Sequence, residues 1–292
     1  MARSRLSEET DDCSEPGPQL GAEALIPLER SHWPTLRSWF QPERPGPLVG
    51  LHAIQTGRDG IGVDRWPDPR AVFAWSGANV GLAGDPAAFG PDDFPKDWQA
   101  MVDAPPEFLP LLRRLAPDLA SWDRIISELR AEPTYRVPRG ASVRRLEARD
   151  ALLVERLDPD VAWICDTLGG PAGLAASGFA WGAFVDGKLA SVAASFFVGE
   201  RYEDIGVVTE RAFRGRGLVP ACAGRLTEEI RARGRTPSWT TSTDNRASLR
   251  VAEKLGFERS RDDVLYVVGM PLPEPARPPE RKPAEGSRGE NR

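Results

Sequence analysis

The sequence predicts an α/β fold for residues 135–270, with a mixed β-sheet flanked by helices. Strand-like apolar runs alternate there with stretches in which apolar residues recur at three- and four-residue steps, as in helices. Asp186-Gly187 joins two strand-like runs and is a strong hairpin signal. A Gly-rich turn then leads from a strand into a long helix. This order of elements is typical of a sheet with helices packed on its faces.

Local signals place each element of this region. Apolar residues spaced four apart give residues 218–233 one apolar face, and Gly234 ends that helix. Asn245 is well placed to cap the helix at residues 245–255, which Gly256 ends. The expected strands are residues 142–146, 178–185, 188–198, 202–209, 238–243 and 264–268, and the expected helices are residues 150–157, 218–233 and 245–255.

Residues 23–134 are expected to form a smaller α/β N-terminal domain. Strand-like runs at residues 70–75 and 80–83 flank a turn, and residues 108–115 and 119–129 show helical periodicity. Six of the nine tryptophans lie in this part of the chain. They are more often core or interface residues than the lining of a ligand pocket, and both interpretations stay open.

The two ends of the chain have little apolar content. Residues 1–22 are rich in polar residues, proline and glycine and are expected to be a disordered leader. Residues 271–292 are Pro-rich and are expected to be a disordered tail, because proline blocks both helix and central strand. The domain boundaries predicted from sequence are therefore 22/23, 134/135 and 270/271.

Composition excludes several classes of function. The formal net charge is −5, which argues against a general nucleic-acid or membrane-surface binder. Cys13, Cys165 and Cys222 are far apart and fit neither a metal site nor a disulfide framework, and only two histidines are present. No apolar run approaches the roughly 20 residues of a membrane helix. We expect a cytoplasmic protein with no metal, membrane or nucleic-acid partner.

The Gly-rich turn at residues 214–217 is the most informative feature. It reads Arg-Gly-Arg-Gly and opens the long helix. Glycines let the backbone approach a ligand closely, and the free N–H groups and dipole of a helix N-terminus favour an anion. Arg214 and Arg216 add positive charge in an acidic chain. The alternative is a surface turn with solvated arginines, and the turn alone does not decide between the two.

A second segment, about thirty residues further on, adds specificity. It contains Asn245 and Ser248 and ends in the run 254–257, Lys-Leu-Gly-Phe. Together with the Gly-rich turn, in this order, it resembles the GNAT superfamily of acyl-CoA-dependent N-acyltransferases over about residues 135–270. The resemblance implies a mixed sheet that splays open between the strand before the turn and the strand after the helix, with acetyl-CoA in the split.

The resemblance also implies which residues hold acetyl-CoA. Backbone groups of residues 207–209 would hold the pantetheine and thioester end, and N–H groups of residues 214–219 would hold the pyrophosphate. The implied cofactor-binding residues are Val207, Val208, Thr209, Arg214, Gly215, Arg216, Gly217, Leu218, Val219, Asn245 and Ser248. Two positions depart from the family pattern. Val219 stands where Gly or Ala is usual. Ala252 stands where many members carry a tyrosine that acts as general acid toward the leaving thiolate.

The catalytic candidates are few. Glu203 and Asp204 begin the cofactor strand, and one of them would take the proton of the attacking amine. They lie on opposite faces of the strand, and we lean slightly towards Glu203. Tyr266 is a weak candidate for the general acid, with Tyr202 as a substitute. Cys222 falls on the buried face of its helix and is expected to be a core residue rather than an acyl carrier.

The predicted function is transfer of an acetyl group from acetyl-CoA to an amine of a small molecule or peptide, by direct attack in a ternary complex. The alternative is an acyl-CoA sensor without turnover, which the residues at 219 and 252 favour. Nucleic-acid binding through Arg211, Arg214 and Arg216 is a third reading, which the acidic balance disfavours. The first half is a possible degenerate copy of the same fold. The protein would be a monomer or a homodimer.

Overall fold

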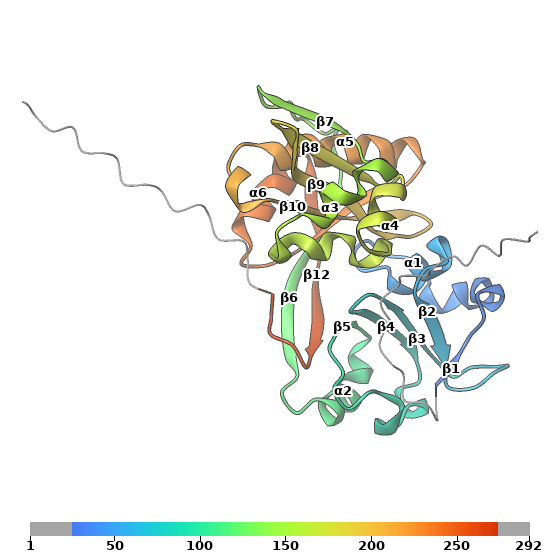
Figure 1. The fold of residues 1–292 in the computed structure, drawn as a ribbon. Coiled ribbons are helices and arrows are strands. Elements are labelled where there is room, and N and C mark those ends of the chain that lie inside the picture. Colours follow the sequence, from blue (N-terminus) through green and yellow to red (C-terminus); the bar gives the residue numbers. More distant parts are fainter. Residues whose placement is uncertain (1–24, 274–292) are drawn as a thin grey trace, which may run out of the picture.

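The computed structural model describes residues 25–273. The predicted leader, residues 1–22, lies outside the described residues, and the predicted tail is described only as far as residue 273. All the strands of the described part join in one twelve-stranded mixed sheet, in the order β1-β2-β3-β4-β5-β12-β6-β11-β10-β9-β8-β7. Figure 1 shows this sheet running from a lower lobe, built from the first half of the chain, into an upper lobe.

The bounds of the elements are as follows. The strands are β1 (Ile26–Pro27), β2 (Gly60–Val63), β3 (Ala71–Ser76), β4 (Asn79–Gly84), β5 (Ala100–Asp103), β6 (Ala120–Leu129), β7 (Ala141–Arg145), β8 (Ala180–Val185), β9 (Lys188–Val198), β10 (Tyr202–Thr209), β11 (Thr236–Ser242) and β12 (Phe257–Val268). The α-helices are α1 (Val49–Thr56), α2 (Leu109–Leu115), α3 (Ala151–Glu155), α4 (Gly170–Ala176), α5 (Leu218–Ala232) and α6 (Arg246–Lys254). The 3-10 helices are η1 (Arg30–Phe40), η2 (Pro86–Ala88), η3 (Pro91–Asp93), η4 (Pro106–Phe108), η5 (Ala148–Asp150), η6 (Pro159–Leu168) and η7 (Arg211–Phe213).

Most of the predicted elements are confirmed, with one error. Every strand and helix expected in residues 135–270 is present within a few residues of its predicted bounds, although β12 is longer than expected and α4 and η6 were not predicted. The segment 119–129 was predicted to be a helix and is the strand β6. Its side chains are buried on both faces in the second half of the strand, which removes the apolar–polar alternation of a half-buried strand.

The sheet is symmetric about the pair β6·β12. Outward from that pair, each half has an antiparallel neighbour, then one parallel pair, then three antiparallel pairs. The parallel pairs β4·β5 and β10·β11 each extend over only three residue pairs. The two halves of the chain therefore repeat the same strand plan within one sheet.

The two halves exchange their last strands. β6 comes from the first half of the chain but pairs with β11 of the second half, while β12 pairs with β5 of the first half. β6 and β12 also pair with each other over ten residue pairs and lie side by side where the lobes meet (Figure 1). The predicted boundary at 134/135 cuts this exchange, and a separate N-terminal domain is not seen.

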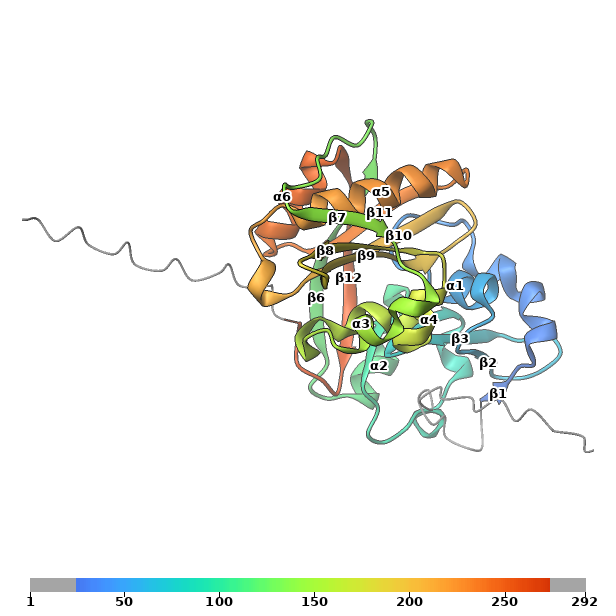
Figure 2. The ribbon, with the colours of Figure 1, turned by 45° about the horizontal axis from the view of Figure 1, so that its top comes forward.

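Helices cover both faces of the second half of the sheet. Figure 2 shows α5 on one face of β8, β9 and β10, with α3 and α4 on the other. Helix α6 packs against β11 and β12 and contacts α5. Helix α5 packs its apolar face on β8 and β9, and Cys222 and Leu226 are fully buried in that layer. The predicted apolar face of this helix is confirmed. The chain thus leaves the end of β10 and enters a helix that is well anchored on the sheet.

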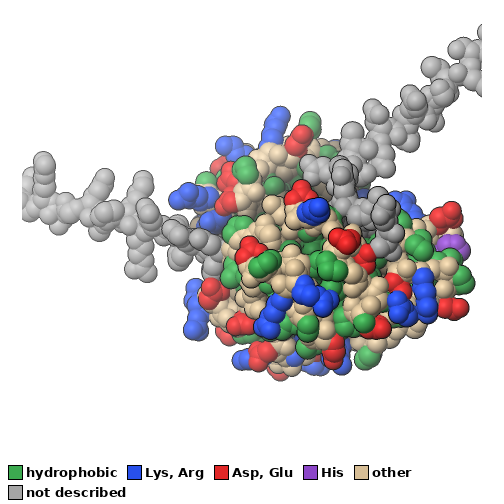
Figure 3. Space-filling view, turned by 90° about the horizontal axis from the view of Figure 1, so that it is seen from below, with side chains coloured by type: hydrophobic (Ala, Val, Ile, Leu, Met, Phe, Trp, Pro, Cys, Tyr) green, Lys and Arg blue, Asp and Glu red, His purple; other side chains and the backbone are tan. Residues whose placement is uncertain are grey.

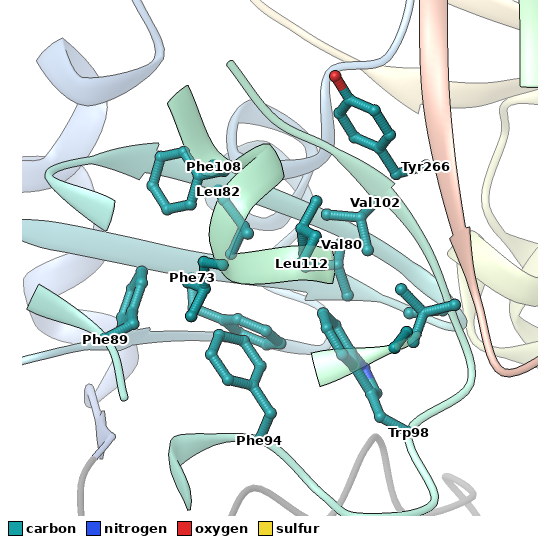
Figure 4. Close-up of a cluster of buried hydrophobic side chains, with 14 of the residues drawn as sticks. Phe73, Val80, Leu82, Phe89, Phe94, Trp98, Val102, Phe108, Leu112 and Tyr266 are labelled. Atoms are coloured by element: carbon teal, nitrogen blue, oxygen red, sulfur yellow. The ribbon is translucent and has the colours of Figure 1, made fainter. Parts of the chain in front are cut away.

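The first half has its own aromatic core. Figure 4 shows Phe73, Phe94, Trp98 and Phe108 packed together, with Tyr266 of β12 at the edge of the cluster and its hydroxyl pointing away from the rings. Trp33 and Trp98 are buried, which confirms the prediction of core tryptophans at these two positions.

Candidate active site

The sheet opens between β10 and β11. The two parallel strands pair only from Tyr202↔Thr236 to Asp204↔Ser238. Beyond this point β10 continues to Thr209 on β9 alone, while β11 continues on β6. A bulge between Asp204 and Ile205 marks the point of divergence. The predicted splay is confirmed, and it leaves one backbone edge of β10 without a strand partner from Ile205 to Thr209 within the described chain.

The Gly-rich turn stands at the wide end of this wedge. Gly215 and Gly217 adopt left-handed φ values of 78° and 75°, which L side chains rarely adopt. Gly217 is the N-cap of α5, whose first-turn N–H groups have no intrahelical acceptors. A Cβ built on Gly217 would meet nothing closer than Pro138 Cγ at 3.9 Å. The turn is therefore unobstructed at Gly217, and anion binding there stays a prediction.

The arginines of the turn are held by protein groups. Arg214 Nε donates to the carbonyl of Thr209 at 3.2 Å, and its Nη2 contacts Asp160 at 3.1 Å. Arg216 lies over the ring of Phe213 at 5.1 Å. Arg214 thus braces the turn against the end of β10. On the molecular face seen in Figure 3, acidic and basic side chains are interspersed.

The side chains of β10 are used in packing. Val208 is buried against the α3–α4 layer, and Val207 packs against the α5 layer. The hydroxyl of Thr209 lies 3.0 Å from that of Ser191. A ligand in the wedge would therefore meet the backbone edge of residues 207–209 rather than their side chains. At the first turn of α5, Leu218 is buried and Val219 is half-buried in the same layer.

Asn245 and Ser248 form the cap of α6. Asn245 Oδ1 accepts from the Ser248 N–H at 3.1 Å, and Ser248 Oγ accepts from the indole of Trp239 at 2.9 Å. Asn245 therefore caps the helix as predicted. Ala252 is buried on the inner side of α6, where many family members carry tyrosine. A cofactor role for Asn245 or Ser248 stays a prediction.

Glu203 lies in a closed ion cluster at the narrow end. Its side chain is fully buried on the α5 side of the sheet. Arg233 contacts it at 2.6 Å and 2.9 Å, Arg235 contacts it at 3.0 Å, and Ser195 donates to it. Two guanidinium groups neutralise this carboxylate. Its surroundings are those of a structural anion and do not support the lean towards Glu203 as the base.

Asp204 lies on the other face, at the vertex of the wedge. Its Oδ1 accepts from Ser238 at 2.7 Å and from Thr240 at 3.0 Å, and its Oδ2 accepts no hydrogen bond from residues 25–273. The residue is 5% exposed. Burial raises the pKa of Asp204 to about 6, while the hydroxyls of Ser238 and Thr240 and the charge of Arg124 lower it and Asp263 raises it. Asp204 has the surroundings of a group that exchanges protons near neutral pH.

The other catalytic candidates lie elsewhere. Tyr266 belongs to the aromatic core of the first half and pairs with Val102 and Ser121 across the sheet. Tyr202 begins β10 and packs against the core around α1. Cys222 is fully buried, and burial raises the pKa of its thiol to about 12. Cys222 is the core residue that its periodicity predicted. The structure brings neither tyrosine to the wedge beside Gly217.

Sequence reasoning missed the hydroxyls that hold Asp204. Ser238, Thr240 and Ser242 alternate along β11, and Ser238 and Ser242 are buried. Small hydroxyl residues at every second position of an interior strand would have signalled a polar stripe on one face of the sheet. Within residues 25–273 no helix has the length and apolar character to span a bilayer, and no three metal-ligating side chains gather.

Comparison with known proteins identifies the family. The sequence model of the GNAT acetyltransferase family matches residues 49–266, so the likeness begins well before the predicted boundary at residue 135. An uncharacterized N-acetyltransferase of Streptomyces virginiae is 38% identical over 218 residues, which cover 72% of this chain and 90% of that protein.

Solved structures share the fold. A GCN5-related N-acetyltransferase-like protein of Streptococcus suis matches with a TM-score of 0.59 at 19% identity, over 81% of this chain and 98% of the other. A tandem GNAT protein from the clavulanic acid biosynthesis pathway matches with a TM-score of 0.53 at 14% identity, over 85% and 98%. With its splayed sheet and its Gly-rich turn at a helix N-terminus, the chain belongs to the GNAT acetyltransferase family.

Proposed function

We propose that the chain transfers an acetyl group from acetyl-CoA to an amine acceptor by direct attack in a ternary complex. The observation that carries the proposal is the wedge between β10 and β11, with a helix N-terminus at its wide end and Asp204 at its vertex. A thioester placed along β10 would lie between an anion site and a proton acceptor. The acceptor amine belongs to a small molecule or a peptide.

The residues present fit acetyl-CoA. The turn is open at Gly217, so the pyrophosphate would accept hydrogen bonds from the N–H groups of residues 214–219. Pro220, next in the chain, has no N–H to add. The free edge of residues 207–209 would pair with the extended pantetheine arm. The bound thioester supplies an activated acetyl carbonyl. The chain supplies its orientation, and a backbone N–H of β10 beside the register shift at Asp204/Ile205 would polarise that carbonyl.

Asp204 is the proposed general base. The amine must be neutral to attack, so its proton passes to Asp204 Oδ2, directly or through a water. The amine nitrogen then bonds to the carbonyl carbon, the carbon–sulfur bond breaks, and its electron pair stays on the sulfur of CoA. The second proton that the nitrogen loses passes to this thiolate, directly or through a water, so that free CoA thiol is released. A carboxylate whose pKa lies near 6 is ionised at pH 7 yet basic enough to accept that proton. Both oxygens of Glu203 are held in ion pairs by two arginines, so they are less available to an acceptor amine.

The test is release of free CoA thiol with a panel of primary amines. Wild-type protein is expected to release thiol with at least one amine. Asp204→Asn should lower kcat/KM by roughly 10²–10⁴-fold near pH 7 and by less at high pH, where the amine deprotonates unaided. If Asp204→Asn keeps the wild-type rate at every pH, another group is the base. Glu203→Gln is not a clean control, because it leaves Arg233 and Arg235 unpaired.

The same assay decides between the enzyme and an acyl-CoA sensor. The sensor is favoured by Val219 at the turn and by Ala252 at the usual tyrosine position. A protein that binds acetyl-CoA in calorimetry and releases no thiol with any amine would be a sensor.

The first half of the chain is a proposed degenerate copy of the GNAT fold. The support is the mirrored strand plan, in which the parallel strands β4 and β5 pair over only three residue pairs, as β10 and β11 do. β4 is followed by the short η2 instead of a long helix, so this copy has no counterpart of the Gly-rich turn and α5 within the described residues. One acetyl-CoA per chain is expected.

A further inference from the structure

A short loop from the first half of the chain covers the vertex of the wedge. We call residues 42–47, between η1 and α1, the vertex loop. The carbonyl of Pro45 accepts from Arg261 of β12 at 3.1 Å. Gly46 has φ 115°, and a Cβ built there would lie 2.4 Å from Ile126 Cδ1 of β6. The loop therefore lies directly on the exchanged strands β6 and β12, close to the backbone.

Glu43 anchors one end of the loop to the turn before β10. Its Oε1 accepts the N–H groups of Arg201 and Tyr202 at 3.0 Å and 2.9 Å. Its Oε2 accepts those of Glu200 and Arg201 at 3.3 Å and 3.0 Å. The residue is buried and contacts no cationic side chain among the described residues. Three N–H donors, one of them shared by both oxygens, replace the water that a carboxylate would otherwise bind, so Glu43 fixes the turn that leads into Asp204.

Gly46 anchors the other end to Ser238. The N–H of Gly46 donates to Ser238 Oγ at 3.3 Å. The Ser238 oxygen thus accepts one hydrogen bond, and its single hydrogen is left to donate to a different acceptor. The carboxylate oxygen Asp204 Oδ1 is 2.7 Å away and the carbonyl of Glu203 is 3.5 Å away, so the hydrogen goes to Asp204. Oδ1 is then satisfied, and Oδ2 is the oxygen left for an acceptor.

We propose that the vertex loop positions the proton-accepting oxygen of the active site: Glu43 fixes the turn before Asp204, and Gly46 holds Ser238 so that it donates to Asp204 Oδ1. This rests on the proposed role of Asp204 as base. It gives the first half of the chain a role in the reaction of the second half: Glu43, Gly46 and Ser238 are positioning residues, which act through Asp204 and do not touch the substrates.

The electrostatic surroundings of Asp204 make this positioning measurable. The groups that face it are Ser238 and Thr240 on β11, Arg124 on β6 and Asp263 on β12. Arg124 and Asp263 form an ion pair with each other, so the two hydroxyls are the hydrogen-bond donors to the carboxylate. Losing the hydrogen bond from Ser238 must weaken the ionised form of Asp204 and move its titration to higher pH.

The experiment is a ¹³C NMR titration of the Asp204 carboxyl in the full chain, with Asp204→Asn to assign the signal. Ser238→Ala should raise the titration midpoint by about one pH unit. Gly46→Ala, which displaces the loop from Ile126, should raise it in the same direction. Glu43→Gln should also raise the midpoint of Asp204. The amide NH2 would replace one carboxylate oxygen and face the backbone N–H groups that this oxygen now accepts from, which would displace the turn. Glu29→Gln is the matched control, at an exposed position in the same half, and should leave the midpoint unchanged.

The sign of the Glu43→Gln effect separates positioning from simple charge removal, since removing a nearby negative charge would lower the midpoint. The proposal is overturned if Ser238→Ala leaves the midpoint unchanged. It is equally overturned if Gly46→Ala and Glu43→Gln, both folded by their thermal midpoints, titrate like the wild type. If Gly46→Ala does not fold, Glu43→Gln alone decides. If the midpoints shift as expected but the protein releases no thiol, the positioning proposal holds and the proposed catalytic function is wrong.

Discussion

Replacement of Ile126 by alanine tests whether the exchanged strands make the two halves one cooperative unit. Ile126 lies in β6, is fully buried, and pairs with Thr240 of β11 on one side and Arg261 of β12 on the other. Its Cδ1 also fills the space beside Gly46. β6 and β12 are the two central strands of the described sheet, with five strands on either side.

The cost of Ile126→Ala follows from the buried volume that it removes. A fully buried Ile→Ala change costs about 2–5 kcal/mol, and the upper part of that range applies where neighbours cannot close the cavity. Strands on both sides of β6 hold the backbone in place, so collapse is limited here. At about 2–4 °C per kcal/mol for a chain of this size, the thermal midpoint should fall by roughly 4–20 °C.

Differential scanning calorimetry checks both the size and the cooperativity. The wild type and the variant should each give one transition, which moves as a whole. Leu152→Ala is the control, since Leu152 is 62% exposed on α3 and should change stability by no more than about 0.5 kcal/mol. Two transitions, only one of which moves in Ile126→Ala, would refute the idea that strand exchange couples the halves.

Three further predictions concern the site, a buried histidine and the buried thiol. Gly217→Glu should weaken acetyl-CoA binding at least about tenfold in calorimetry, because a side chain and a negative charge would enter the anion site, where each hydrogen bond to a charged group contributes ~1.5–3 kcal/mol; unchanged affinity would place the pyrophosphate elsewhere. Burial lowers the pKa of His52 to about 4, so its neutral form adds stability above pH 6.5 that is lost as the pH falls towards 4, about 3 kcal/mol in all. Urea unfolding at pH 7 and pH 4.5 should show a smaller loss in His52→Gln than in the wild type, and equal losses would contradict the assignment. Cys222→Ala should keep kcat within about twofold, whereas a loss of turnover in a folded variant would revive an acyl-cysteine step.

The Gly-rich turn was predictable because its structure is local. Two glycines with positive φ, a helix that begins at the next residue and a preceding strand are all encoded within residues 202–232. The hairpin at Asp186-Gly187 is equally local, and both of its residues adopt positive φ. These elements depend on turn chemistry and periodicity, so the sequence alone was enough to place them.

β6 was not predictable in the same way. Trp122, Ile125 and Ile126 recur at helical steps, but the segment forms a strand because β11 and β12 hold it on both sides. Its partners are distant in sequence, as in the ion pair of Arg124 with Asp263, 139 residues further on. A strand buried on both faces loses its alternating pattern, so periodicity cannot separate it from a helix. Because β6 was predicted to be a helix, the predicted boundary at 134/135 separates it from its sheet partners β11 and β12.

The choice between Glu203 and Asp204 shows the same limit at the site. The two carboxylates are adjacent in sequence and differ only in the face of β10 that they occupy. What separates them is which distant groups reach each face: Arg233 and Arg235 close around Glu203, while Asp204 meets hydroxyls and keeps one oxygen free. Two arginines occupy both oxygens of Glu203, whereas burial raises the pKa of Asp204 to about 6. On our proposal, Glu203 is therefore the structural carboxylate and Asp204 the base, and the vertex loop acts on Asp204 through Ser238.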